Sequence, residues 1–127
     1  MKTRTILAAL GLMGLLSTAS YPQDAEKGAT VFKKCMVCHT IEEGGAKKLG
    51  PSLKGIVGRK AASVEGYKYS DAMLAKAAEG VVWDEATLAA YLPDPKGFVP
   101  GTKMVFPGLK NPEDVANLIA FLKTKAM

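Results

Sequence analysis

The sequence contains few cysteine and histidine residues: among 127 residues there are two cysteines and one histidine. A structural zinc site usually needs four cysteine or histidine ligands, so these three residues do not form one. The sequence also lacks the alternation of apolar and polar residues that marks β-strands, and it contains no internal repeat or low-complexity run. A small helical domain is therefore the simplest prediction.

The sequence has no strong excess of one charge either. It contains 17 basic and 12 acidic side chains, which give a formal net charge of +5, and its lysine pairs are spread along the chain. A nucleic-acid-binding protein would show a basic stripe with interleaved aromatic residues or a recognisable binding motif. We therefore expect no nucleic-acid partner.

Long apolar runs are confined to the N-terminus, which has the pattern of a secretory signal peptide. Lys2 and Arg4 precede an apolar run over residues 6–16, and small residues follow it. The run is too short to span a membrane, although an uncleaved N-terminal anchor is the alternative. We expect the signal peptide in the first 20 residues, cleavage near residues 19–22, and a single domain over residues 21–127.

Both cysteines and the histidine fall in one motif, Cys35-Met36-Val37-Cys38-His39. This spacing is the attachment motif of c-type haem, in which each cysteine sulfur adds to a haem vinyl group. The imidazole that follows can bind the iron as the proximal ligand. A thioredoxin-like redox pair is the alternative for two cysteines at this spacing, but it requires a βαβ pattern that the flanking residues lack. The motif predicts one covalently attached haem c.

Four helical stretches are predicted: from about residue 24 towards 35, over 70–80, from 84 to a stop at Pro93, and from 111 towards the C-terminus. Gly28 lies on the apolar face of the first stretch, where a missing side chain allows another helix to approach closely. Long irregular segments separate the stretches and can wrap a large apolar cofactor. The expected fold is a small all-α domain of about four helices around the haem.

The second axial ligand distinguishes an electron carrier from a haem enzyme, and methionine is the remaining candidate type. Four of the six methionines lie in the signal peptide, in the attachment motif or at the chain end. Met73 lies on an apolar helical face, where a packing role is favoured. Met104 lies in a loop rich in proline and glycine, which can bring one side chain onto a flat ring. We therefore predict Met104 as the ligand.

With these motifs the chain resembles the class I c-type cytochromes, the group of mitochondrial cytochrome c and bacterial cytochrome c2. The resemblance is carried, in order along the chain, by Gly28 and Phe32, Cys35 to His39, Gly50-Pro51, Gly58-Arg59-Lys60, Gly66-Tyr67-Lys68-Tyr69, Trp83, Tyr91-Leu92 and Pro100-Gly101-Thr102-Lys103-Met104. It implies a cytochrome c-like fold over nearly all of the mature chain.

The resemblance also implies roles for residues on the His39 side of the haem. Pro51 would accept a hydrogen bond from the second ring nitrogen of His39, which fixes the imidazole and raises its basicity. Arg59, Tyr69 and Trp83 would bond or neutralise the haem propionates, because an unpaired buried charge is very costly.

On the other side of the haem, the resemblance implies that Tyr91 and Thr102 steady Met104 and a buried water. Met73 stands where the family usually has a polar residue near that water. An insertion-like stretch around residues 75–80 departs from the mitochondrial pattern and points towards the bacterial branch.

The function that follows from the resemblance is a periplasmic carrier that moves one electron at a time and catalyses no reaction. The alternative is a haem enzyme or gas sensor with an open sixth site. A peroxidase-like enzyme would need an acid-base residue near that site, and no second histidine exists.

The implied partners are acidic redox proteins: a quinol-oxidising cytochrome bc complex as donor, and a photosynthetic reaction centre or a terminal oxidase as acceptor. If the family's geometry holds, docking would use the lysines around the haem edge, which are Lys34, Lys48, Lys96 and Lys103. We expect a monomer without stable membrane insertion. Loss of the two basic residues of the signal peptide leaves a modest charge of +3.

Overall fold

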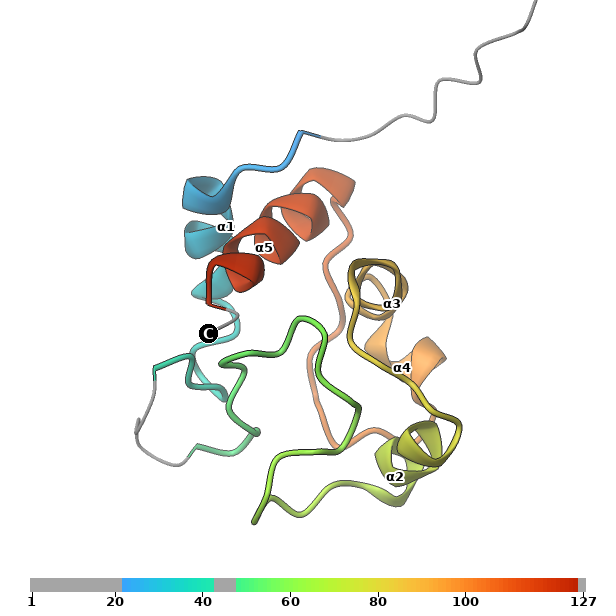
Figure 1. Ribbon diagram of the computed structural model, residues 1–127. Helices are drawn as coiled ribbons and strands as arrows, with labels where there is room; N and C mark the ends of the chain where they lie inside the picture. Colours follow the sequence, from blue (N-terminus) through green and yellow to red (C-terminus); the bar gives the residue numbers. More distant parts are fainter. Residues whose placement is uncertain (1–21, 43–47, 126–127) are drawn as a thin grey trace, which may run out of the picture.

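The computed structural model describes residues 22–42 and 48–125, so the predicted signal peptide and its cleavage site lie outside the described residues. Within these ranges the chain forms five helices (Figure 1): α1 (Ala25–Phe32), α2 (Asp71–Ala78), α3 (Glu85–Tyr91), α4 (Pro95–Phe98) and α5 (Pro112–Thr124). The extended pairing in the same ranges is one antiparallel bridge between Lys60 and Val82. The predicted all-α class is confirmed.

Each helix begins at a side chain that caps its N-terminus, because the first backbone N–H groups of a helix have no partner within it. The caps are Asp24, Ser70, Asp84, Asp94 and Asn111. Four of the five stand where the sequence predicts a helix to begin. Local capping chemistry therefore fixes most of the helix starts.

Two features of the helices differ from the prediction. α1 ends at Phe32, three residues before Cys35, and turns follow it up to Cys38. α4 is one turn of α-helix that was not predicted, because the proline and glycine in its sequence are typical of non-helical turns. It forms because Pro95 is suited to the first helical position and Asp94 accepts a hydrogen bond from the Gly97 N–H, at 3.1 Å.

α1 and α5 form the main helix pair (Figure 1). They approach each other closely at Gly28. A Cβ atom on Gly28 would overlap the carbonyl oxygen of Asn117 and lie 2.7 Å from the Cβ of Phe121. The rings of Phe32 and Phe121 pack beside this contact, with their centroids 5.2 Å apart. The close approach predicted at Gly28 is confirmed, and it requires a residue without a side chain.

The rest of the chain is built largely from loops that close the space between α5 and the α2–α4 region (Figure 1). The apolar stripe of α5 is buried and consists of Val115, Leu118, Ile119 and Leu122. None of the helices in the described ranges is both long and apolar enough to cross a membrane. The helices and loops together leave a large internal cavity.

Candidate haem site

The cavity has a volume of about 780 Å³ and is lined mainly by apolar side chains of α3, α5 and the loops. Its charged lining residues are all cationic: Lys34, Arg59, Lys60, Lys68 and Lys103. No aspartate or glutamate lies among the described residues that line it. The cavity therefore suits an apolar group that carries negative charge at its edge.

Cys35, Cys38 and His39 all line this cavity. A turn after α1 brings them together, in which Cys38 N–H and His39 N–H both donate to the carbonyl of Cys35, at 3.1 and 2.9 Å. Both cysteines are half-buried and neither forms a disulfide. Burial raises the pKa of the Cys35 thiol, and the charge of Lys34 opposes that rise. The turn thus presents two thiols and one imidazole to the same space.

The imidazole of His39 is held by the loop that follows it. Its Nδ1 lies 2.7 Å from the carbonyl oxygen of Pro51, the contact that the resemblance implies. A carbonyl only accepts hydrogen bonds, so Nδ1 carries the proton and Nε2 keeps a lone pair that can bind a metal. Burial lowers the pKa of His39, although its bond to Pro51 opposes this change. The lowered pKa favours the neutral ring that metals require.

Gly50 is part of the same support, and sequence reasoning did not give it this role. A Cβ atom at Gly50 would lie 2.5 Å from Cε1 and 2.7 Å from Nδ1 of His39. Its backbone N–H donates to the carbonyl of Cys38, at 2.7 Å. Only a glycine lets this backbone lie flat against the ring while it binds the attachment motif.

Met104 lines the cavity from a loop that contains no helix. The hydroxyl of Tyr91 lies 3.6 Å from the Met104 sulfur, and the Thr102 hydroxyl accepts a hydrogen bond from the Met104 N–H at 3.2 Å. Burial raises the pKa of Tyr91 to about 12, although a bond to Thr102 opposes the rise, so the phenol remains a donor at neutral pH. Met73 lines the same cavity from α2 and is half-buried.

Arg59, Tyr69 and Trp83 also line the cavity. Arg59 donates to the carbonyls of Ser52 and Lys54, at 2.8 and 3.0 Å, and among the described residues it pairs with no carboxylate. Burial lowers the pKa of its guanidinium. The Tyr69 hydroxyl accepts from the backbone N–H of residue 64 at 2.9 Å, which leaves its own hydrogen to donate. These groups can receive an anionic substituent of a ligand.

The four predicted docking lysines do not all lie at the cavity. Lys34 and Lys103 line the cavity, and the ammonium group of Lys48 donates to the carbonyl of Met36 in the attachment motif. Lys96 is exposed on α4 and is not among the lining residues. Lys60 and Lys68 also line the cavity, although they were not predicted as docking residues, because the path of their loop brings them there.

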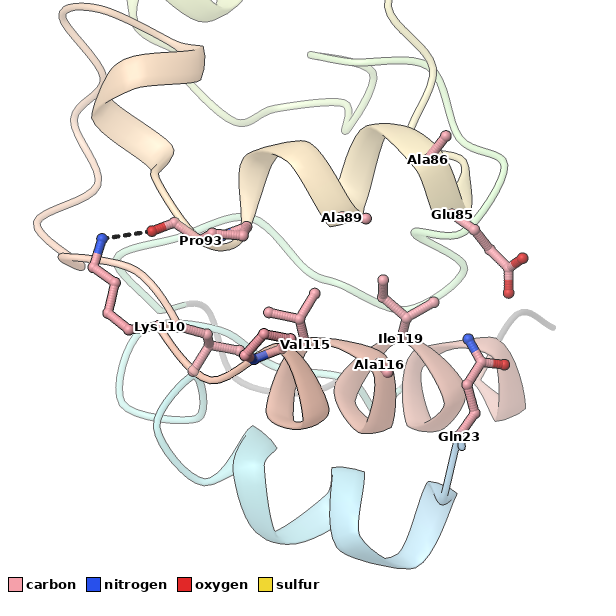
Figure 2. A pocket seen from close by; sticks show the side chains of 11 residues that line it. Gln23, Glu85, Ala86, Ala89, Pro93, Lys110, Val115, Ala116 and Ile119 are labelled. Atoms are coloured by element: carbon pink, nitrogen blue, oxygen red, sulfur yellow. Dashed lines mark hydrogen bonds between the residues drawn. The ribbon is translucent and has the colours of Figure 1, made fainter. Parts of the chain in front are cut away.

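A second groove of about 480 Å³ lies between α3 and α5 (Figure 2). Its floor is made of small and aliphatic side chains such as Ala89, Val115 and Ile119. At one end Lys110 donates to the carbonyl of Pro93 at 2.7 Å, and at the other Glu85 pairs with a lysine of α5 at 2.6 Å. This groove offers no thiol, imidazole or thioether, so the larger cavity is the candidate site.

An all-α domain with two thiols, one imidazole and two thioethers around an apolar cavity has the composition of a c-type haem domain. The sequence matches the family model for cytochrome c over residues 25–126, and the chain belongs to this family.

Relatives and a solved structure are similar to this chain over most of its length. Cytochrome c2 of Rhodomicrobium vannielii is 48% identical over 120 residues, or 94% of each chain. Cytochrome c of Gibberella zeae is 52% identical over 101 residues, which are 79% of this chain and 92% of the relative. The structure of cytochrome cH from Methylobacterium extorquens superposes with a TM-score of 0.72 at 48% identity, over 80% of this chain and 99% of that one.

As a member of this family the protein is an electron carrier and not an enzyme, and it carries one covalently bound haem c. The residues around the cavity fit such a group. The walls are apolar, the charged lining residues are cationic, and two thiols lie beside an imidazole whose Nε2 can bind iron.

Proposed function

We propose that the haem is attached through Cys35 and Cys38, that His39 and Met104 are its axial ligands, and that the protein shuttles single electrons in the periplasm. The observation that carries this proposal is that all four side chains line one apolar cavity, with the His39 ring already fixed by Pro51. When bound, the haem supplies the iron that alternates between Fe(II) and Fe(III).

The two candidate axial residues have different chemical tasks. His39, neutral and oriented through its Nδ1 proton, offers Nε2 as a strong nitrogen ligand. Met104 offers a soft thioether, which favours Fe(II) and so raises the reduction potential. The Tyr91 hydroxyl, 3.6 Å from the sulfur, limits the directions in which that side chain can turn. With both positions filled, a small molecule can bind the iron only by displacing one of these ligands.

Arg59, Tyr69 and Trp83 are proposed to receive the propionates. A buried carboxylate needs charge-assisted hydrogen bonds, and the guanidinium and the phenol can both supply them. The indole N–H is a further donor, and its ring also packs on Tyr91 with centroids 4.8 Å apart. These side chains would hold the charged end of the cofactor without exposing its apolar part.

Docking of redox partners is proposed at the cavity mouth, with Lys34, Lys48 and Lys103 as the basic rim and Lys96, exposed on α4, as a further charge outside the cavity lining. Three apolar side chains near the attachment motif and the Met104 loop are strongly exposed: Val37 at 78%, Leu49 at 83% and Val105 at 86%. A partner with an acidic rim and an apolar centre would match this surface, since charges guide the encounter and a small interface permits rapid release.

The proposed partners are a quinol-oxidising cytochrome bc complex as donor and a photosynthetic reaction centre or terminal oxidase as acceptor. The proposed location in the periplasm is supported by the similarity to a cytochrome c2 of Rhodomicrobium vannielii and by the N-terminal signal pattern.

Optical spectroscopy of the holoprotein, produced in a host that attaches c-type haem, tests the ligand set. We expect haem colour to remain with the chain after acid-acetone extraction. The oxidised protein should show the weak near-infrared sulfur-to-iron charge-transfer band, and the reduced protein should not bind carbon monoxide. Absence of the band together with carbon monoxide binding would refute Met104 as the sixth ligand.

A further inference from the structure

Two hydrogen bonds connect the loop of His39 with the loop of Met104 through a pair of adjacent residues, Tyr67 and Lys68. The Tyr67 hydroxyl donates to the carbonyl of Leu49 at 3.0 Å, and the ammonium group of Lys103 donates to the carbonyl of Lys68 at 3.1 Å. Leu49 directly precedes Gly50, which lies against the His39 ring, and Lys103 directly precedes Met104.

The segment that contains this pair, residues 61–70, has an internal structure of its own. The hydroxyl of Tyr69 accepts from the N–H of residue 64 at 2.9 Å, across a turn in which Gly66 has a φ of +79°. The rings of Tyr67 and Tyr69 pack edge to face with centroids 4.8 Å apart. The C-terminal end of the segment is Ser70, which caps α2. A segment held in this way can transmit a restraint from one loop to the other.

Apart from this connection, the described hydrogen bonds of the Met104 loop lie at its ends and on its own side of the cavity. Its ends are fixed by Val99 and Leu109, which are 0% and 3% exposed, and Leu109 N–H donates to the carbonyl of Leu92 at 2.8 Å. Between them, Met104 is steadied by Thr102 and Tyr91 only on its own side of the cavity. Among the described residues, the hydrogen bond from Lys103 to the carbonyl of Lys68 ties this loop to the segment over residues 61–70.

We propose that Tyr67 and Lys103 are positioning residues for electron transfer: with residues 61–70 they form a strap that holds the Met104 loop towards the His39 loop and protects the sulfur ligand from displacement. The strap is defined as residues 61–70 with the two hydrogen bonds at its ends. This inference rests on the proposed role of Met104 as an axial ligand.

The two hydrogen bonds of the strap act one after the other along a single connection, so their effects differ from those of two independent surface bonds. Since the restraint runs from Leu49 through Tyr67 and Lys68 to Lys103, breaking either bond interrupts the whole connection. A second break then adds nothing. Two bonds that act independently would instead give effects that multiply, which is what a double-mutant cycle measures.

The experiment titrates imidazole, as a competing ligand, into the oxidised holoprotein and follows loss of the near-infrared band. Tyr67→Phe removes one hydroxyl and keeps the ring, while Lys103→Leu removes the other donor. We expect each variant to bind imidazole several-fold more tightly than the wild type, and the double variant to bind it no more tightly than the stronger single variant. Lys103→Arg, which keeps a donor, should restore most of the resistance.

Lys110→Leu is the matched control, because Lys110 makes the same kind of bond to a backbone carbonyl, at 2.7 Å, outside the cavity (Figure 2). It removes the same charge and should leave imidazole affinity unchanged. Effects of Tyr67→Phe and Lys103→Leu that multiply, or an equal effect of Lys110→Leu, would overturn the strap. A wild type without the near-infrared band would instead overturn the proposed ligand set, so the two failures are distinct.

Discussion

The two sides of the cavity hold their proposed iron ligands in different ways. On the His39 side, the thiols and the imidazole lie within five consecutive residues, in a turn closed by bonds to the carbonyl of Cys35. On the Met104 side, the sulfur lies in a loop, and its neighbours come from positions 13 residues away at Tyr91 and, through Lys103, 35 residues away at Lys68.

This difference shows which side depends on the fold as a whole. A turn built from neighbouring residues forms whenever its own backbone bonds form, whereas contacts between distant residues require the complete tertiary structure. The His39 side should therefore survive perturbations that release Met104. The predictions below test this contrast, from the largest expected effect to the smallest.

The largest effect is expected for His39→Ala. It removes the nitrogen ligand and the ring that Pro51 orients, so no strong ligand remains on the side where the thioethers form. We expect little or no stable holoprotein, measured as haem absorbance per unit of purified protein. A normal yield of stable holoprotein would show that the attachment motif does not provide the axial ligand.

Met104→Ala should have a large effect of a different kind. The covalent attachment and the His39 ligand remain, so the variant should fold with haem. It should lose the near-infrared band, bind carbon monoxide when reduced, and show a lower midpoint potential, by an appreciable part of the roughly 0.8 V that axial ligands can cover. Retention of the band with a shifted potential would assign the sulfur ligand to Met73 instead.

Gly50→Ala tests how tightly the His39 side is packed. The added Cβ would lie 2.5 Å from Cε1 of His39, so the backbone or the ring must move. Overpacking of this kind typically costs about 1–3 kcal/mol. Guanidinium unfolding of the holoprotein should show this loss with the near-infrared band preserved, since Met104 is not touched. Unchanged stability would mean that the loop around Gly50 yields easily and that this side is less rigid than proposed.

The same contrast accounts for which parts could be predicted from the sequence. The attachment motif and the helix caps at Asp24, Ser70, Asp84 and Asn111 depend on residues a few positions apart, so their patterns are visible in the sequence. Gly28 was also recognisable, because a glycine destabilises a helix interior and its presence on an apolar face therefore indicates a close helix contact.

Features that depend on the paths of loops were not predictable in this way. Nothing local in the sequence indicates that Lys60 and Lys68 line the cavity, or that Tyr67 reaches the carbonyl of Leu49. Gly50 could be expected to mark a turn, but its contact with the His39 ring depends on the path by which the loop comes back to that ring. The residues that line a pocket come from loops far apart in the sequence, and the tertiary structure decides which of them come into contact.

Met73→Ala should have a smaller effect than the changes at Met104, and it separates packing from ligation. Met73 is half-buried in the cavity wall, so the expected cost is below the 2–5 kcal/mol typical of a fully buried methionine, at about 1–2 kcal/mol. The near-infrared band should remain. Loss of the band in Met73→Ala, with its retention in Met104→Ala, would reverse the assignment of the ligand.

The smallest effect is expected for the lysines at the cavity mouth. Lys34 is the cleanest probe of the proposed basic rim, because it lines the cavity next to Cys35, whereas Lys103 is also part of the strap. Lys34→Glu should slow electron transfer to an acidic redox partner at low salt, while Lys110→Glu, in the α3–α5 groove, should slow it less.

Exposed charges are screened beyond about 8 Å at physiological ionic strength, so the difference between Lys34→Glu and Lys110→Glu should shrink as salt is added. Each exposed pair is worth only about 0.2–1 kcal/mol, which limits the change in rate to a few-fold. The midpoint potential should stay nearly constant in both variants, because water already solvates these charges. Stopped-flow rates at several ionic strengths provide the measurement. Equal slowing by both substitutions would mean that net charge alone guides the encounter, and the cavity mouth would then not be the docking surface.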